Sequence, residues 1–208
     1  MTKRDVSDRK KAFSSIYDEK YWADENLSGA GSSLEATKVT REIIQKVVAD
    51  YNVGSIVDVA CGDFVWMPLV LERLGDHVDY IGCDIVESQV KSHAENYPQY
   101  EFRNADFVVD DIPNAELIIC RDALQHLPVP DIQKALANFS ASGAKYLLAT
   151  THIRRYGIRN GRNIRPGRCR DRNILLPPFN LPDPVVIYSE KYPDQHKFLG
   201  LWELPFGQ

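Results

Sequence analysis

An acidic residue ends or closely follows each of the first four apolar segments of this chain. These acids are Asp63, Asp84, Asp106 and Asp122. If the apolar segments are parallel strands, their carboxyl ends meet at one edge of a sheet, where open α/β folds bind their ligands. Carboxylates at such an edge can accept hydrogen bonds from hydroxyl or ammonium groups. We therefore expect a polar ligand site along this edge.

The residue types at this edge suit a ligand that contains adenosine. Asp84 can accept both hydroxyls of a ribose, and Asp106 followed by Phe107 suits the amino group and the face of an adenine. The small residues Ala60 and Gly62 let the backbone approach a ligand closely. The phosphate-binding patterns GxGxxG and GxxxxGK(S/T) do not follow the first apolar segment, which disfavours a nucleotide phosphate there.

The turn after the first apolar segment favours an amino acid at the other end of the ligand. The charge of Asp63 would repel a pyrophosphate, but it can bond an ammonium group. Asp58 belongs to the same site, or else it is a buried acid that bonds the amides of the turn. Adenosine joined to an amino acid is S-adenosylmethionine, which we predict as the cofactor, with S-adenosylhomocysteine as its product.

Two histidines are candidates for a general base. Methyl transfer needs an acceptor atom in line with the methyl–sulfur bond, and a hydroxyl acceptor also needs a base to take its proton. Asp122 and His126 are four residues apart, so a helical turn starting at Asp122 would put both on one face. His152 is the competing base. The alternative is that His126 only caps or packs.

These residues need a sheet to position them. Alternating apolar strands and amphipathic helices with short connections predict an α/β fold, with a mostly parallel seven-stranded sheet and helices on both faces. The expected strands are 55–60, 80–84, 100–105, 115–120, 145–151, 185–189 and 198–204, the last two as an antiparallel pair. The expected helices are 34–49, 67–74, 86–96 and 131–140.

Length and composition indicate one domain. The chain has 208 residues and a formal net charge of −4, which argues against a surface that is basic throughout and binds nucleic acid. We divide it into an N-terminal segment and helix (1–50), a cofactor-binding core (51–151), and an acceptor-side loop with closing strands (152–208). No apolar run is long enough for a membrane span or a signal peptide, so we expect a cytoplasmic protein.

The four cysteines do not have the spacing of a metal site. Cys61, Cys83, Cys120 and Cys169 are scattered, which favours reduced thiols over a disulfide framework or zinc. We assign no metal ligand. Magnesium dependence stays open.

Segment 154–172 has the most unusual composition in the chain. It holds eight arginines and a single acid, Asp171. Arginine without lysine favours bidentate or stacked contacts over diffuse attraction. The segment is either a solvated loop paired with acidic surface, or a mobile loop that grips a phosphate, a carboxylated or nucleotide-linked sugar, or RNA.

The run Val-Asp-Val-Ala-Cys-Gly-Asp-Phe at 57–64 resembles the first motif of class I S-adenosylmethionine-dependent methyltransferases, with Ala60 where a glycine is common. The chain is similar along most of its length to a small bacterial and viral subfamily linked to polysaccharide modification. The matching runs lie at 28–32, 61–67, 80–86, 120–127, 142–148 and 178–182. A chlorovirus glycan-building protein carries a similar methyltransferase domain that acts on rhamnose.

The resemblance implies a class I methyltransferase fold, in which segment 28–32 is either a lid over the cofactor or a mere linker. The cofactor-binding residues are then Asp58, Ala60, Gly62, Asp63, Asp84, Ile85, Asp106, Phe107, Arg121 and Gly29. The leading hypothesis is O-methylation of a sugar or glycan, such as terminal rhamnose. The alternatives are RNA or nucleotide methylation through segment 154–172, and a non-catalytic module that only binds the cofactor.

Overall fold

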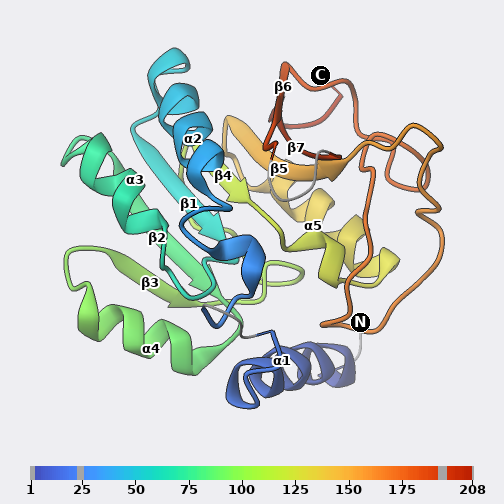
Figure 1. Ribbon diagram of the computed structural model, residues 1–208, viewed down its shortest axis with the longest axis horizontal. Coiled ribbons are helices and arrows are strands. Elements are labelled where there is room, and N and C mark those ends of the chain that lie inside the picture. Colours follow the sequence, from blue (N-terminus) through green and yellow to red (C-terminus); the bar gives the residue numbers. More distant parts are fainter. Residues whose placement is uncertain (1–2, 23–25, 192–195, 208) are drawn as a thin grey trace.

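Seven strands form a single sheet within the residues that the structure describes, namely 3–22, 26–191 and 196–207. The structure is a computed structural model, shown in Figure 1. The strand order is β3-β2-β1-β4-β5-β7-β6. The strands are β1 (Ser55–Val59), β2 (Asp79–Asp84), β3 (Glu101–Asn104), β4 (Leu117–Cys120), β5 (Tyr146–His152), β6 (Val186–Ser189) and β7 (Lys197–Glu203).

The first five strands run parallel to one another, β7 runs in the opposite sense, and β6 runs in the same sense as the first five. Strand β7 lies between β5 and β6 and pairs antiparallel with both. The strand order reverses between β1 and β4, because β2 and β3 are added on one side of β1, whereas β4 and the later strands are added on its other side. The predicted mostly parallel seven-stranded α/β sheet is confirmed, and so is the antiparallel final pair.

Helices cover both faces of the sheet because successive strand residues point to opposite sides. In β1, Ile56 packs with residues of α2 (Lys38–Asp50) and α3 (Met67–Leu74), whereas Val57 packs with residues of α5 (Val129–Ala141). Helix α4 (Glu87–Asn96) contacts β2 and β3. The central strands β1, β4 and β5 are therefore buried on both faces, as the sequence pattern indicated.

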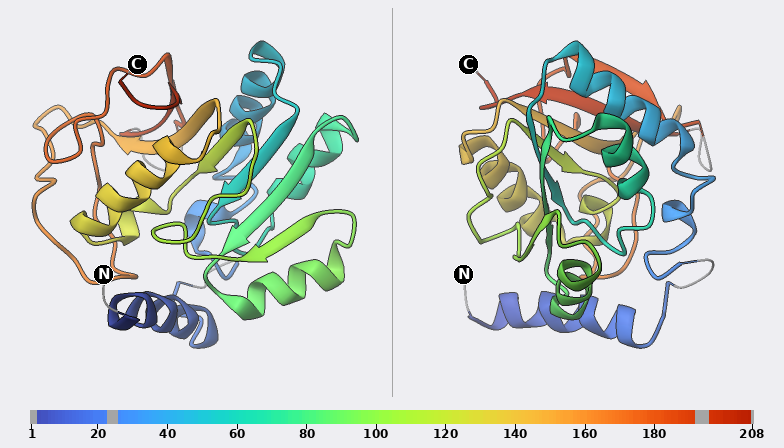
Figure 2. Two further views of the ribbon diagram at one scale, coloured as in Figure 1. Left: turned by 180° about the vertical axis from the view of Figure 1, so that it is seen from behind. Right: turned by 90° about the vertical axis from the view of Figure 1, so that its left-hand side faces the viewer.

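Helix α1 (Lys3–Asp18) was not predicted from the sequence, in which our first expected helix begins at residue 34. It runs across the lower end of the molecule in Figure 2, beside the carboxyl ends of the strands. Arg9, on its inward face, is 1% exposed and forms ion pairs with Asp106 and Asp131. A charged residue occupies a buried position, so the apolar pattern of this helix is incomplete.

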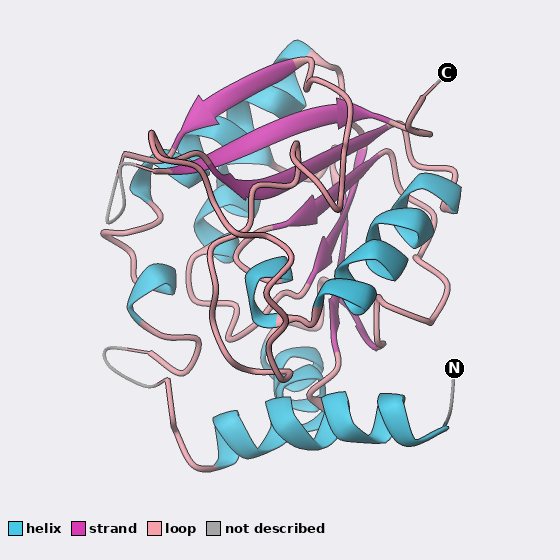
Figure 3. Ribbon diagram, turned by 90° about the vertical axis from the view of Figure 1, so that its right-hand side faces the viewer, coloured by secondary structure: helices cyan, strands magenta, loops and turns pink. Residues whose placement is uncertain are grey.

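A long connection without helix or strand joins β5 to β6, and it carries the arginine-rich segment (Figure 3). Two short 3-10 helices, Ala30–Ser32 and Leu124–His126, lie elsewhere in the chain. In the described part of the chain, no helix is both long and apolar enough to cross a membrane. The four cysteines are free thiols, and the described residues contain no cluster of three or more potential metal ligands.

Candidate active site

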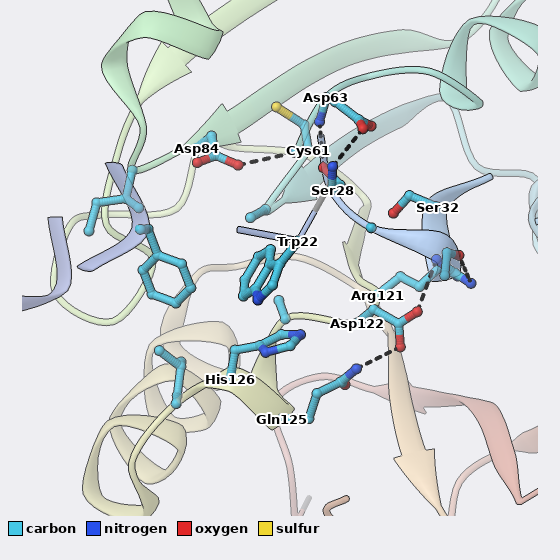
Figure 4. Close-up of a pocket in the computed structure, with 18 of the residues that line it drawn as sticks. Trp22, Ser28, Ser32, Cys61, Asp63, Asp84, Arg121, Asp122, Gln125 and His126 are labelled. Atoms are coloured by element: carbon cyan, nitrogen blue, oxygen red, sulfur yellow. Dashed lines mark hydrogen bonds and ion pairs between the residues drawn. The ribbon is translucent and has the colours of Figure 1, made fainter. Parts of the chain in front are cut away.

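A cavity of about 470 Å³ opens at the carboxyl ends of the parallel strands, near the reversal of the strand order. This volume lies within the range of roughly 300–1,000 Å³ that is usual for small-molecule sites. All ten residues that we expected to bind the cofactor line the cavity, and so do Asp122 and His126. Figure 4 shows how the labelled side chains from distant parts of the sequence converge on it.

Asp84 is held in place by the backbone. Its Oδ2 accepts a hydrogen bond from the Gly62 amide at 3.0 Å, and its Oδ1 accepts one from the Val86 amide at 2.9 Å. Burial nevertheless raises the pKa of Asp84 to about 6. A carboxylate fixed in this way at the end of β2 can also accept hydrogen bonds from ligand hydroxyls in the cavity.

Asp58 is 3% exposed and bonds a side chain rather than the turn. The Tyr80 hydroxyl donates to its Oδ2 at 3.1 Å, whereas we had considered bonding to the turn's own amides. Burial raises the pKa of Asp58 to about 7, and the nearby charge of Asp84 adds to the rise. Asp58 therefore lines the cavity as a group whose charge changes close to neutral pH.

Asp106 lines the cavity and is bonded to Arg9, a partner that the sequence did not predict. The Nε and Nη2 atoms of Arg9 donate to Asp106 Oδ2 at 2.9 and 2.7 Å, and the Val108 amide donates to Oδ1 at 3.2 Å. The expected bond from an adenine amino group to Asp106 stays a prediction. The Arg9 contact was not expected because helix α1, which supplies Arg9, was not predicted.

Segment 26–33 is joined to the run at 57–64 by a reciprocal pair of hydrogen bonds. The Ser28 amide donates to Asp63 Oδ2 at 2.8 Å, and the Asp63 amide donates to Ser28 Oγ at 3.0 Å. Tyr17 from α1 adds a bond to the same hydroxyl at 2.7 Å. At Gly62, φ is +61°, and a Cβ would lie 2.7 Å from Ser28 Oγ, so only glycine fits there.

The far wall of the cavity contains a buried network of four charged groups. Arg121 Nε donates to Glu190 Oε1 at 2.8 Å, and Arg121 Nη1 lies 3.1 Å from Asp122 Oδ2. Lys197 Nζ donates to Asp122 Oδ2 at 2.7 Å and lies 3.6 Å from Glu190 Oε2. Although burial disfavours its charge, Arg121 and Lys197 hold the pKa of Asp122 well below its usual value. The network as a whole is neutral.

His126 and Asp122 share the cavity but not a helical face. Asp122 has a left-handed backbone, with φ of +51°, and the 3-10 helix begins only at Leu124. This corrects our expectation of a helical turn starting at Asp122. Gln125 donates to Asp122 Oδ1 at 2.9 Å, so the carboxylate is oriented by Gln125 and Lys197 rather than by His126.

The His126 ring packs against Trp22, with the ring centroids 4.5 Å apart. Its Nδ1 atom is buried and has no hydrogen-bond partner among the described residues. Burial lowers the pKa of His126 to about 4, against the opposing attraction of Asp122. The imidazole is therefore neutral at pH 7 and can accept a proton or a hydrogen bond.

His152, the other candidate base, does not line the cavity. It ends β5 and is 5% exposed. Its Nδ1 accepts a hydrogen bond from the Arg172 amide at 3.3 Å, and its Nε2 lies 3.7 Å from Asp171 Oδ1. These contacts place His152 under the arginine-rich segment.

The comparisons with known proteins agree with this geometry. Residues 56–142 match the family model of a methyltransferase domain. The N-methyltransferase NodS from Bradyrhizobium japonicum WM9, solved with S-adenosylhomocysteine, aligns over 91% of this chain and 98% of its own, with 11% identity and a TM-score of 0.65. The fold is that of the S-adenosylmethionine-dependent methyltransferases.

Other methyltransferase structures are similar over nearly the whole chain. Magnesium protoporphyrin IX methyltransferase from Synechocystis PCC 6803, with bound S-adenosylmethionine, covers 97% of both chains, with 14% identity and a TM-score of 0.66. Human N-acetylserotonin methyltransferase covers 98% of this chain and 67% of its own, with 13% identity and a TM-score of 0.55. Among curated protein sequences, none matches the chain. The three solved structures carry the names of different methyltransferases, so they do not indicate which acceptor this chain uses.

Several cavity residues of this methyltransferase fold were missed by the sequence analysis. They are Arg9, Phe13, Tyr17, Trp22, Gln125 and Lys197. The first four come from α1 and the turn after it, where helical spacing of Arg9, Phe13 and Ile16 was the available signal. For Lys197 no local signal exists, because its place depends on how β7 pairs with β5.

Proposed function

We propose that this protein binds S-adenosylmethionine and transfers its methyl group to a hydroxyl of a sugar or glycan. The observation that carries the proposal is the neutral His126 ring, which lines the same cavity as the residues suited to the cofactor and whose buried Nδ1 has no hydrogen-bond partner among the described residues. The sugar class, with terminal rhamnose as its most specific member, rests on the resemblance to the polysaccharide-linked subfamily. A cytoplasmic location is part of the proposal and suits free thiols.

The chemistry of the cavity wall fits the cofactor. Ile85 and Phe107 offer an apolar wall for an adenine, and Asp84 at the end of β2 can accept ribose hydroxyls. Asp58 and Arg121 offer opposite charges for the ammonium and carboxylate of a methionine. S-Adenosylmethionine supplies an activated methyl group on a positively charged sulfur. The segment around Gly29 then acts as a lid, held shut by the Ser28–Asp63 bonds.

The acceptor hydroxyl requires a base, and the chain provides one. The neutral His126 ring, which lines the cavity, would take the hydroxyl proton as the oxygen becomes nucleophilic and accepts the methyl group from the sulfonium. The resulting imidazolium would be stabilised by the nearby Asp122 carboxylate, whose charge favours protonation of His126. Lys197 and Gln125 keep that carboxylate in place. Trp22 holds the imidazole ring from the other side.

Labelled methyl transfer tests the proposal. The protein is incubated with methyl-labelled S-adenosylmethionine and a panel of rhamnose-bearing oligosaccharides, other oligosaccharides and total RNA, and cofactor binding is measured separately by calorimetry. We expect label in the oligosaccharide fraction, and none there with His126→Ala. Cofactor binding without transfer to any acceptor would instead favour the non-catalytic module.

RNA methylation is the second candidate, favoured by the arginine-rich segment. Eight of the chain's 25 basic residues lie between 154 and 172. Binding through several phosphate contacts weakens steeply with salt. Label in the RNA fraction, together with RNA binding that falls steeply between 50 and about 200 mM salt, would favour this candidate over the sugar acceptor.

A further inference from the structure

The arginine-rich segment 154–172, which we call the frame, is held in a defined conformation by buried side chains. Arg172 is 1% exposed, and its Nη1 donates to the carbonyl oxygens of Asn160 at 2.7 Å and Arg162 at 3.1 Å. Asn160 is also buried, and its Nδ2 donates to the carbonyls of Asn173 at 2.7 Å and Pro177 at 3.0 Å. Two buried side chains thus satisfy backbone groups that a helix or strand would otherwise satisfy.

This frame is joined to the segment that carries the candidate base. The Gly167 amide donates to the His126 carbonyl at 3.0 Å, and the Arg170 amide donates to the Gln125 carbonyl at 3.0 Å. A Cβ at Gly167 would lie 2.5 Å from Ile16 of α1, so the frame also packs closely on that helix. The exposed arginines are therefore displayed at a fixed place beside the cavity.

A second, shallower hollow of about 320 Å³ lies on this frame. Arg154, Arg159 and Arg170 line it, with Asp171 as its one acid. Cys169 lines both this hollow and the main cavity, so the two adjoin. Arg154 Nε donates to Asp171 Oδ2 at 2.6 Å, which orients that guanidinium.

The charge of the frame is opposite to that of the whole protein. Segment 154–172 contains eight arginines but only one of the 29 acids of a chain whose net charge is −4. Guanidinium groups bind phosphate oxygens through paired, planar hydrogen bonds. A hollow that holds three of them, one positioned by a carboxylate, suits a compact group with more than one negative charge.

We propose that this hollow binds the phosphate groups of a phosphorylated sugar, either a sugar phosphate or a nucleoside diphosphate sugar, and so directs its sugar hydroxyl toward His126. The proposal rests on the proposed function and names the acceptor class of that site. Because the hollow adjoins the cavity at Cys169, a sugar attached to the bound phosphate has a direct route to the base. The methylated unit would then reach the glycan by a later glycosyl transfer.

The first test is binding without turnover. Uridine diphosphate, thymidine diphosphate and inorganic pyrophosphate are titrated into the protein saturated with S-adenosylhomocysteine, using calorimetry. We expect binding that weakens at least tenfold in Arg159→Ala/Arg170→Ala. The matched control is Arg73→Ala, an exposed arginine of α3 outside both cavities, which should bind like the unchanged protein. A glucose phosphate, titrated in the same way, separates simple sugar phosphates from nucleotide sugars.

The second test compares acceptors. A nucleoside diphosphate sugar should be methylated with at least tenfold higher kcat/KM than the same free sugar, and the double variant should lose this preference through KM. Failure of all four phosphate compounds to bind, or equal binding to the unchanged protein and the double variant, overturns the inference. So does binding of an RNA oligomer, titrated in the same way, when none of the four binds. Equal methylation of free and phosphorylated sugars also overturns it, while leaving the proposed function intact. Methylation of no acceptor defeats the proposed function.

Discussion

The ammonium group of Lys197 lies 2.7 Å from the carboxylate of Asp122, although 75 positions separate the two residues in the sequence. The pairing of β5 with β7 brings them together, because Lys197 is in register with His152 at the end of β5. Asp122 also receives the Arg121 guanidinium, and Glu190 balances the second positive charge. The last strand of the sheet therefore completes the polar wall of the cavity.

Removal of the Lys197 charge should destabilise the fold strongly. Lys197→Met leaves Asp122 and Glu190 facing only Arg121, and an unbalanced buried charge costs about 3–5 kcal/mol. Urea unfolding monitored by fluorescence would measure the loss. Lys38→Met, at the exposed start of α2, is the control and should change the free energy of unfolding by less than about 0.5 kcal/mol.

The same network provides a second check. Glu190→Gln removes one of the two negative charges of the network, so adding it to Lys197→Met should restore neutrality and recover part of the lost stability. Additive losses in the double variant would contradict the charge balance inferred from the structure.

His126→Ala should lower kcat by about 10²–10⁴-fold, because the acceptor hydroxyl loses its base. Affinity for S-adenosylhomocysteine, measured by calorimetry, should stay within about twofold, which separates a catalytic from a structural loss. His77→Ala changes an exposed histidine outside the cavity and should retain full activity.

The pH dependence of turnover gives an independent test of His126. Because burial lowers its pKa to about 4, His126 is neutral throughout the physiological range. At saturating substrates, kcat should therefore be flat from pH 8 to pH 6 and should fall only as the pH approaches 4. An acidic limb centred near pH 6.5, the value of an exposed histidine, would disagree with this assignment.

Asp84→Asn should weaken binding of S-adenosylhomocysteine by about 10- to 100-fold, since hydrogen bonds to a charged group are each worth about 1.5–3 kcal/mol. The amide would also place an N–H group against one of the two backbone donors that now bond Asp84. Asp79→Asn, at the exposed start of β2, is the control. Equal affinity of both variants for the product would remove Asp84 from the binding site.

Asp58 should make the stability of the cofactor-free protein depend on pH. The folded protein keeps its proton up to about pH 7, whereas the unfolded chain releases it near pH 4. Between these values the folded state binds more protons, so the contribution of Asp58 to stability is present at low pH and is lost as the pH rises through 7. The slope is about 1.4 kcal/mol per pH unit.

Asp58→Asn removes this dependence. Relative to the unchanged protein, the variant should gain stability steadily between pH 5 and pH 7, while binding S-adenosylmethionine more weakly because the ammonium group loses its partner. Denaturant unfolding at pH 5, 6, 7 and 8 measures the gain. A difference between the two proteins that stays constant with pH would show that Asp58 is ionised throughout. His126 titrates in both proteins, so its effect cancels.

The alternating order of strands and helices could be predicted because burial on both faces leaves a clear signal. The run at 55–60 is apolar at four of its six positions, and its strand, β1, is buried from Ile56 to Val59. The edge of the sheet that carries the expected cofactor-binding residues could also be predicted, because it lies at the carboxyl ends of the parallel strands. Asp84 and Gly62 therefore line the cavity as expected.

What could not be predicted depends on contacts between distant segments. Helix α1 has Arg9 at an inward position, so apolar periodicity understates the helix, and only Asp106 and Asp131 in three dimensions explain why a charge is buried there. The turn at Asp122 adopts a left-handed backbone that its residue type permits but does not require. Neither feature is encoded in the spacing of nearby residues.

The insertion of β7 between β5 and β6 has a consequence for synthesis on the ribosome. A nascent chain that ends before Lys197 already contains the five parallel strands and both histidine candidates, yet Arg121 and Asp122 face a gap where the last strand belongs. Such a chain contains the parallel strands that carry the cavity residues, but the charges of the buried network are not balanced because Lys197 is missing. Cofactor binding should therefore appear abruptly, as the final strand emerges, rather than growing with chain length.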